Sequence, residues 1–113
     1  MSKFDEAIAT YKSQLEDLGI SFDEELLHAV AKGLGPSIYN TDSAKVSCSD
    51  QEELNRIKDN FLKKKLGMAD SNELDEAIQE ICQKMGSSNR NKHRAVFYYL
   101  LVEKFDQKSK YMG

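Results

Sequence analysis

Apolar residues recur along the first third of the chain at the three- and four-residue spacing of an amphipathic helix. The first stripe consists of Phe4, Ile8, Tyr11, Leu15 and Leu18. Gly19 follows it in the position of a helix end. Ser21 and Glu24 then have the spacing of a capping box, and the helix that they open stops between Gly33 and Pro36, where glycine and proline interrupt it. The pattern therefore predicts two helices before the middle of the chain.

Two more helices are predicted in the second half. Ser49 and Glu52 repeat the capping-box spacing, and the stripe that follows them ends at Gly67. A further amphipathic stripe runs from Asp70 to Gly86. In both segments a glycine follows the last apolar position, which is typical of a helix terminus.

The last helix is predicted to start within residues 87–89 and to continue to about Phe105. Its run AVFYYLLV, residues 95–102, is apolar on every side, which is typical of a helix at the centre of a bundle. A buried strand is the competing interpretation, but only Val96 and Val102 in this run are β-branched. We therefore expect an all-α, single-domain bundle of about five helices packed around the last one.

Residues 36–49, PSIYNTDSAKVSCS, form the least regular part of the pattern. They are rich in Ser, Thr, Asn and Asp, with Ile38, Tyr39 and Val46 as isolated apolar positions. The pattern fits a helical turn capped by Asp42 as well as short extended pieces near Ile38 and Val46. We expect an irregular connection here, and its structure stays open.

The composition agrees with one globular domain over residues 1–113, with a polar tail at 106–113 that can fray. Hydrophobic residues make up 40% and charged residues 31%, and charges interrupt every apolar stretch before it reaches the length of a membrane span. The first residues are charged throughout and have no apolar core of an export signal. With only two cysteines in the chain, we expect free thiols and a cytoplasmic location.

The charges are arranged in blocks of alternating sign. Residues 1–30 and 68–85 are acidic, whereas residues 54–66 and 90–113 are basic. The net charge of -3 gives no overall attraction to nucleic acid or to anionic lipid. Packing of acidic helices beside basic ones explains the alternating blocks. Because the net charge is negative, we expect no attachment to a membrane.

The residues that commonly carry chemistry are scattered. His28, Cys48, Cys82 and His93 form no CxxC or HxxxH pair, so we expect neither a metal site nor a cofactor. Cys48 lies just before a helix start, where backbone amides can lower the pKa of a thiol, but a structural cysteine is the favoured interpretation. No catalytic motif is present, so we expect no enzyme.

A cluster of bases precedes the apolar run of the last helix, in GSSNRNKHRAV at residues 86–96. Cations are unfavourable at a helix N-terminus, which is already partly positive. One interpretation is a salt-bridge network with acidic residues of the preceding helix, namely Asp75, Glu76 and Glu80. The other is a phosphate or another anion held by free backbone amides and basic side chains. The residues of this hypothetical anion site are Ser87, Ser88, Asn89, Arg90, Lys92 and Arg94.

Two classes of binding partner follow from these features. The favoured one is a partner protein, docked by a helical interaction module whose surface includes Ile38 and Tyr39. Nucleic acid is the weaker alternative, because the bases stop at Arg94 and the helix before them is acidic, although the order of the two helices resembles a helix-turn-helix. The sequence does not determine the oligomeric state.

Three blocks of the sequence resemble a known family: GLGPSIYN at 33–40, VSCSD at 46–50 and SNRNKHRAVFYYLL at 88–101. They are similar to a family of small bacterial proteins known only as a domain of unknown function. The resemblance covers most of the chain and implies a cytosolic, predominantly helical protein. It implies no activity, ligand or catalytic residue.

Overall fold

The computed structural model of the chain describes residues 3–39, 45–86 and 92–112. Its elements in chain order are α1 (Lys3–Asp17), α2 (Glu24–Leu34), the 3-10 helix η1 (Gly35–Tyr39), α3 (Gln51–Arg56), the π-helix η2 (Ile57–Lys65), α4 (Asn72–Met85), α5 (Arg94–Lys104) and α6 (Ser109–Met112). The five predicted helices correspond to α1, α2, α3 continued by η2, α4 and α5. The described residues contain no strand beyond one isolated bridge, so the all-α fold class is confirmed.

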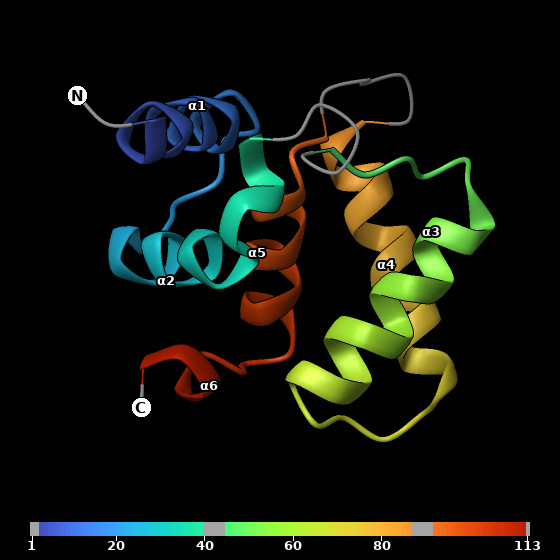
Figure 1. Cartoon of the computed structure of the whole chain (residues 1–113). Helices are drawn as coiled ribbons and strands as arrows, with labels where there is room; N and C mark the ends of the chain where they lie inside the picture. Colours follow the sequence, from blue (N-terminus) through green and yellow to red (C-terminus); the bar gives the residue numbers. More distant parts are fainter. Residues whose placement is uncertain (1–2, 40–44, 87–91, 113) are drawn as a thin grey trace.

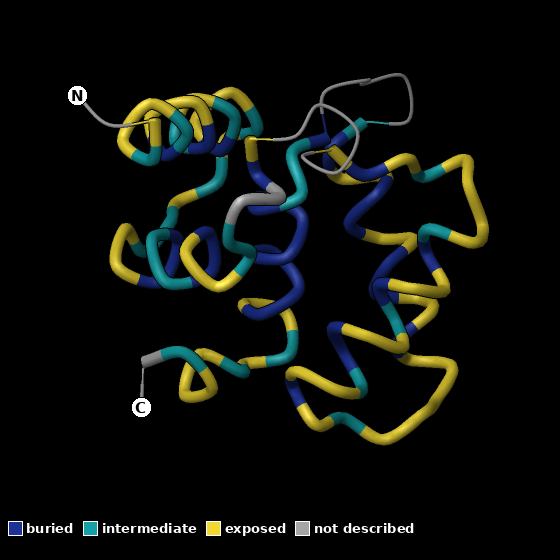
Figure 2. The backbone as a smooth tube through the Cα atoms, viewed as in Figure 1, coloured by how far each residue is buried: buried dark blue, intermediate teal, exposed yellow. Residues whose placement is uncertain are grey.

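Helix α5 lies at the centre of the bundle, with α1 and α2 on one side and α3 and α4 on the other (Figure 1). All eight residues of the run 95–102 are buried, although outer helices expose one face each (Figure 2). The interpretation of this run as a strand is therefore wrong, and its interpretation as the central helix is confirmed. Within the described ranges, no helix combines the length and the apolar character needed to cross a membrane.

The start of α5 differs from the prediction. The helix begins at Arg94 rather than within residues 87–89, and His93 at its N-cap has an extended backbone. An isolated antiparallel bridge joins Lys45 to His93, and the amide of Val46 donates to the carbonyl of Lys92 at 2.8 Å. These contacts keep residues 92–93 out of the helix. They also place an extended piece near Val46, as one of the two alternatives for the irregular connection predicted. The extended piece that this alternative placed near Ile38 is wrong, because Ile38 lies in the 3-10 helix η1. Asp42, the predicted cap in the other alternative, lies outside the described residues.

Two helices are capped by aspartates that directly precede them rather than by the predicted serines. Asp23 caps α2 in place of Ser21, and Asp50 caps α3 in place of Ser49. Each carboxylate accepts hydrogen bonds from the second and third amides after it, at 3.0 and 3.3 Å for Asp23 and at 3.1 and 3.4 Å for Asp50. A carboxylate near the positive end of a helix gains from the helix dipole as well as from the hydrogen bonds, which explains the preference.

The π-helical winding of η2 is not apparent in the sequence. In a π-helix, backbone hydrogen bonds join residues that are five positions apart, so side chains five positions apart lie on the same face. Ile57 therefore shares a face with Leu62, and Phe61 with Leu66. All four of these side chains are at least 95% buried. The segment packs against α4, and the predicted end at Gly67 is confirmed by its left-handed φ of 68°.

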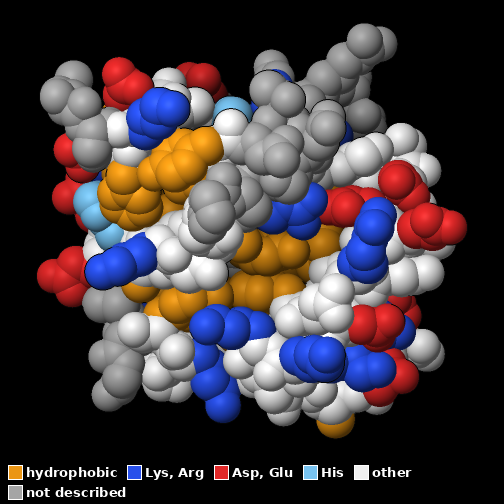
Figure 3. All heavy atoms as spheres, in the orientation of Figure 1, with side chains coloured by type: hydrophobic (Ala, Val, Ile, Leu, Met, Phe, Trp, Pro, Cys, Tyr) orange, Lys and Arg blue, Asp and Glu red, His pale blue; other side chains and the backbone are white. Residues whose placement is uncertain are grey.

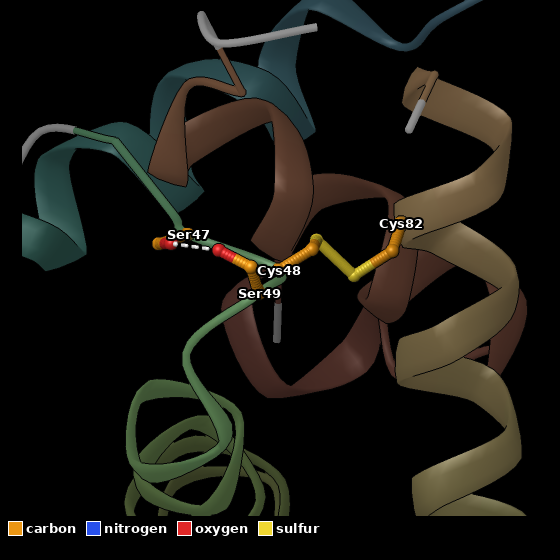
Figure 4. The surroundings of a disulfide bond; sticks show 4 residues. All are labelled: Ser47, Cys48, Ser49 and Cys82. Carbon is orange, nitrogen blue, oxygen red and sulfur yellow. Dashed lines mark hydrogen bonds between the residues drawn. A yellow bond between two sulfur atoms is a disulfide. The ribbon is translucent and has the colours of Figure 1, made fainter. Parts of the chain in front are cut away.

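A disulfide joins Cys48 to Cys82, so the expectation of free thiols is wrong (Figure 4). Cys48 lies in the connection before α3, and Cys82 is a buried residue of α4. The two cysteines are 34 positions apart, but the packing of η2 against α4 brings their Cα atoms to 6.0 Å, a separation that a disulfide spans readily. The bond closes a loop that contains α3, η2 and most of α4.

Reduction of this disulfide should lower the free energy of unfolding. Closing a loop of this length restricts the unfolded chain, and the loop-closure model gives a contribution of about 4 kcal/mol. Urea denaturation of the oxidised and the reduced protein measures the difference. Cys48→Ser serves as the control, because it should match the reduced protein and be insensitive to reductant. Equal denaturation midpoints with and without reductant would contradict a structural role for the bond.

Candidate functional site

The predicted anion site is only partly described. Ser87, Ser88, Asn89 and Arg90 lie outside the described residues, so their part of the hypothesis stays a prediction. Lys92 is buried, with 5% of its surface exposed, and lies in the extended segment that pairs with residues 45–46. The described part of the basic segment is therefore packed into the fold rather than displayed on the surface.

Arg94, the first residue of α5, makes several contacts with other described residues. Its guanidinium forms an ion pair with Glu53 of α3, and both side chains are only 14% exposed. It also donates to the hydroxyl of Tyr98 at 3.0 Å and to the carbonyl of Lys45 at 3.4 Å. Burial lowers the pKa of Arg94, but the interactions with Tyr98 and Glu53 outweigh burial and raise the pKa above its usual value, so the guanidinium stays charged. Arg94 thus joins α5 to α3 and to the connection before it.

This arrangement agrees with the interpretation of the basic cluster as a salt-bridge network at Arg94, but the ion pair of Arg94 is with Glu53 rather than with Asp75, Glu76 or Glu80. Asp75 of α4 pairs with Lys58 at 3.0 Å, and Glu80 pairs with Lys104. The acid that meets Arg94 comes instead from α3, because the extended segment before α5 lies against residues 45–46 and so faces the start of that helix.

The same arginine borders a row of aromatic rings. Its guanidinium carbon lies 5.7 Å from the centre of the Tyr98 ring, a cation–π distance. Tyr98 stacks on Phe61 of η2 with 4.0 Å between ring centres and an angle of 22° between planes. Both rings are largely buried, with 8% and 5% of their surfaces exposed. The stack therefore joins η2 to α5 and forms a rigid apolar floor.

An open groove of about 220 Å³ lies over this floor, and we call it the aromatic groove. Residues of α2, η2, α5 and α6 line it: Gly33, Leu34, Asn60, Phe61, Lys65, Tyr98 and Tyr111. Figure 3 shows apolar surface in the middle of this face, with Lys and Arg side chains above and below it. The groove thus has an apolar floor, and Lys65 is the charged residue that lines it.

Tyr111 of α6 forms one wall of the aromatic groove. The ammonium of Lys65 lies 5.3 Å from the centre of its ring. Burial raises the pKa of Tyr111 to about 12, so the phenol is uncharged and can donate a hydrogen bond at neutral pH. The predicted polar tail therefore contains a short helix with an aromatic residue that is half-buried against the bundle.

Two polar contacts hold the tail in place. Lys108 pairs with Asp23, the N-cap of α2, and this hydrogen bond lowers the pKa of the Asp23 carboxyl. The backbone amide of Asp23 donates at 2.7 Å to the hydroxyl of Tyr99, which donates to Glu103 at 2.8 Å. The start of α2, the end of α5 and the tail before α6 are thereby joined, and Tyr111 is positioned beside η2.

The predicted interaction pair of Ile38 and Tyr39 is split by the structure. Tyr39 is 46% exposed and is the one large hydrophobic residue so exposed among those described. Ile38 is 7% exposed, so the expectation that it lies on the surface is wrong. The 3-10 turn of η1 directs the two side chains apart. A role for Tyr39 in binding stays a prediction.

The aromatic groove was not predicted from the sequence. Phe61 belongs to an ordinary amphipathic stripe, Tyr98 to an apolar run and Tyr111 to a polar tail. Only the packing of η2, α5 and α6 brings these three rings together. An aromatic residue in an otherwise polar tail was the one feature that could have drawn attention to this part of the chain.

Residues 10–109 match a family model described as "Protein of unknown function (DUF2853)". The chain belongs to this family. The match spans most of the chain and confirms the resemblance seen in its three sequence blocks. The description of DUF2853 names no reaction, ligand or partner, so membership gives no catalytic assignment. A comparison with curated proteins finds no match.

Breaking the ion pair between Arg94 and Glu53 should destabilise this DUF2853 protein. Arg94→Gln or Glu53→Gln removes the nearly buried partner of the remaining charge, and each should lower the free energy of unfolding by about 2 kcal/mol. Urea denaturation of both variants and of the double variant measures the loss and the coupling. The double variant should lose less than the sum of the two single losses.

Arg56→Gln is the matched control, because Arg56 contacts the same carboxylate at 3.4 Å but is 61% exposed. Exposed ion pairs contribute little, so this variant should retain nearly the stability of the original protein. An equal loss for Arg56→Gln and Arg94→Gln, or additive losses in the double variant, would contradict the assignment.

His93 should make stability depend on pH. Burial lowers the pKa of its imidazole below 6.5, with Lys45 contributing in the same direction. The unfolded chain therefore binds a proton more readily, so the free energy of unfolding should fall as the pH drops from 7.5 to 5.5. Denaturation at several pH values measures this slope, and His93→Gln should flatten it. An NMR titration that gave His93 a pKa at or above 6.5 would contradict the prediction.

Proposed function

We propose that this protein is a small helical interaction module that binds a partner protein through the aromatic groove. The observation that carries the proposal is the groove itself, in which the Phe61–Tyr98 stack and Tyr111 come together from three elements. Aromatic residues dominate the energetics of protein interfaces because they combine a large apolar area with few rotatable bonds. A rigid floor lowers the entropy cost of binding further.

The size of the groove favours a protein side chain over a small-molecule ligand. Its volume of about 220 Å³ is below the roughly 300 to 1,000 Å³ of ordinary ligand pockets. A single aromatic or branched side chain fits such a space. This supports docking of one anchor residue from a partner surface.

Binding rather than catalysis is part of the same proposal. The thiol of Cys48, which was the weak candidate for chemistry, is bonded to Cys82. A cytoplasmic location stays a prediction from the sequence, and the disulfide between Cys48 and Cys82 is a bond that is uncommon in a reducing cytosol.

Photo-cross-linking at the groove tests the proposed function. p-Benzoylphenylalanine in place of Tyr111 should capture a defined partner in cells of the native host, because position 111 forms the groove wall. The same group in place of Gln83, an exposed residue of α4, is the matched control. Mass spectrometry should identify a protein cross-linked at position 111 and absent at position 83. The same products at both positions, or none at either, would count against the groove as a docking site.

A further inference from the structure

The charges around the aromatic groove indicate what kind of partner it fits, if the proposed function holds. Among the described residues that line the groove none is acidic, and Lys65 is the one that carries a charge. Lys65 lies at the end of η2 with its ammonium over the Tyr111 ring. A negatively charged group entering the groove would therefore meet a cation and no repelling carboxylate on its walls.

Two further lysines stand near the same end of η2. Lys64 is the exposed neighbour of Lys65, and the ammonium of Lys110 in α6 lies 3.9 Å from where a Cβ of Gly67 would be. Lys110 therefore extends from α6 across to the residues that follow η2. Lys64, Lys65 and Lys110 together form what we call the lysine rim.

The lysine rim differs from the neighbouring lysines in its pairing. Lys63 is 3.4 Å from Asp59 and 3.7 Å from Asp70, and Lys108 pairs with Asp23. The three lysines of the rim form no ion pair with any residue in the described part of the chain. Attraction to the negative end of the helix accounts for positive charge at the end of η2, and Lys110 adds a further cation from a different element, α6.

We propose that the aromatic groove receives one aromatic or aliphatic side chain from an acidic segment of the partner protein, whose flanking carboxylates pair with the lysine rim. The apolar floor favours an apolar side chain as the anchor, and the unpaired lysines favour negatively charged residues on either side of it. Nucleic acid fits this surface less well, because the groove accepts a single side chain and the net charge of the chain is -3.

A synthetic peptide with a central Phe flanked by Glu and Asp is a direct probe. Titrated into the labelled full-length protein, it should shift the NMR signals of Phe61, Tyr98 and Tyr111, and higher salt should weaken its binding. A peptide with Ala in place of Phe tests the anchor, and one with Lys in place of the acids tests the charge. Both should bind more weakly than the probe.

Charge reversal at the rim supplies the decisive comparison. The double variant Lys64→Glu/Lys110→Glu should weaken binding of the acidic peptide about tenfold or more, because like charges then face each other. Lys3→Glu/Lys84→Glu, with the same change in net charge at exposed positions of α1 and α4, is the matched control and should bind as the original protein does. Thermal unfolding of both double variants verifies that they remain folded.

The following outcomes would overturn the inference. The acidic and the basic peptide could bind with equal affinity, or the two double variants could weaken binding equally. The peptide could shift only the NMR signals of residues away from the groove. A single-stranded oligonucleotide could also occupy the groove in place of the peptide. If position 111 still cross-links a partner in that case, the proposed function stands and only the acidic partner is wrong. If position 111 captures no specific partner and the peptide does not bind in the groove, both proposals fail.

Discussion

The burial of α5 on all sides is the constraint on which the rest of the structure depends. A helix that is apolar all round gains stability only if other elements cover every face of it. Here α1 and α2 cover one side and α4 another, while η2 closes the remainder through the Phe61–Tyr98 stack. The position of every outer helix follows from this requirement, so the surface features of the protein are set from the inside.

The aromatic groove is a by-product of the same requirement. Tyr98 is the least buried member of the apolar run of α5, and it lies where η2 and α6 approach each other. The ion pair between Arg94 and Glu53 holds the start of α5 against α3, and the contacts of Lys108 and Tyr99 with Asp23 hold the tail. Polar contacts at the two ends of α5 therefore position an apolar surface between them.

Periodicity predicted the helices because it reports burial directly, and the central place of α5 followed from its lack of a polar face. The periodicity of apolar residues could not predict features that depend on contacts between segments distant in the sequence. The extended pairing of residues 45–46 with 92–93 delays the start of α5, and the meeting of Cys48 with Cys82 follows from the packing of η2 on α4. The groove was hidden for the same reason, since its three aromatic residues lie in three different elements.

The central helix is also late in the chain, and this affects the order in which the protein can fold during synthesis. Helices α1 to α4 are translated before the apolar run at residues 95–102 that their inner faces cover. Until that run leaves the ribosome, the earlier helices have no common core to pack against, and their apolar faces stay accessible to chaperones. Folding of the domain is therefore expected to be completed only after residues 95–102 have emerged from the ribosome.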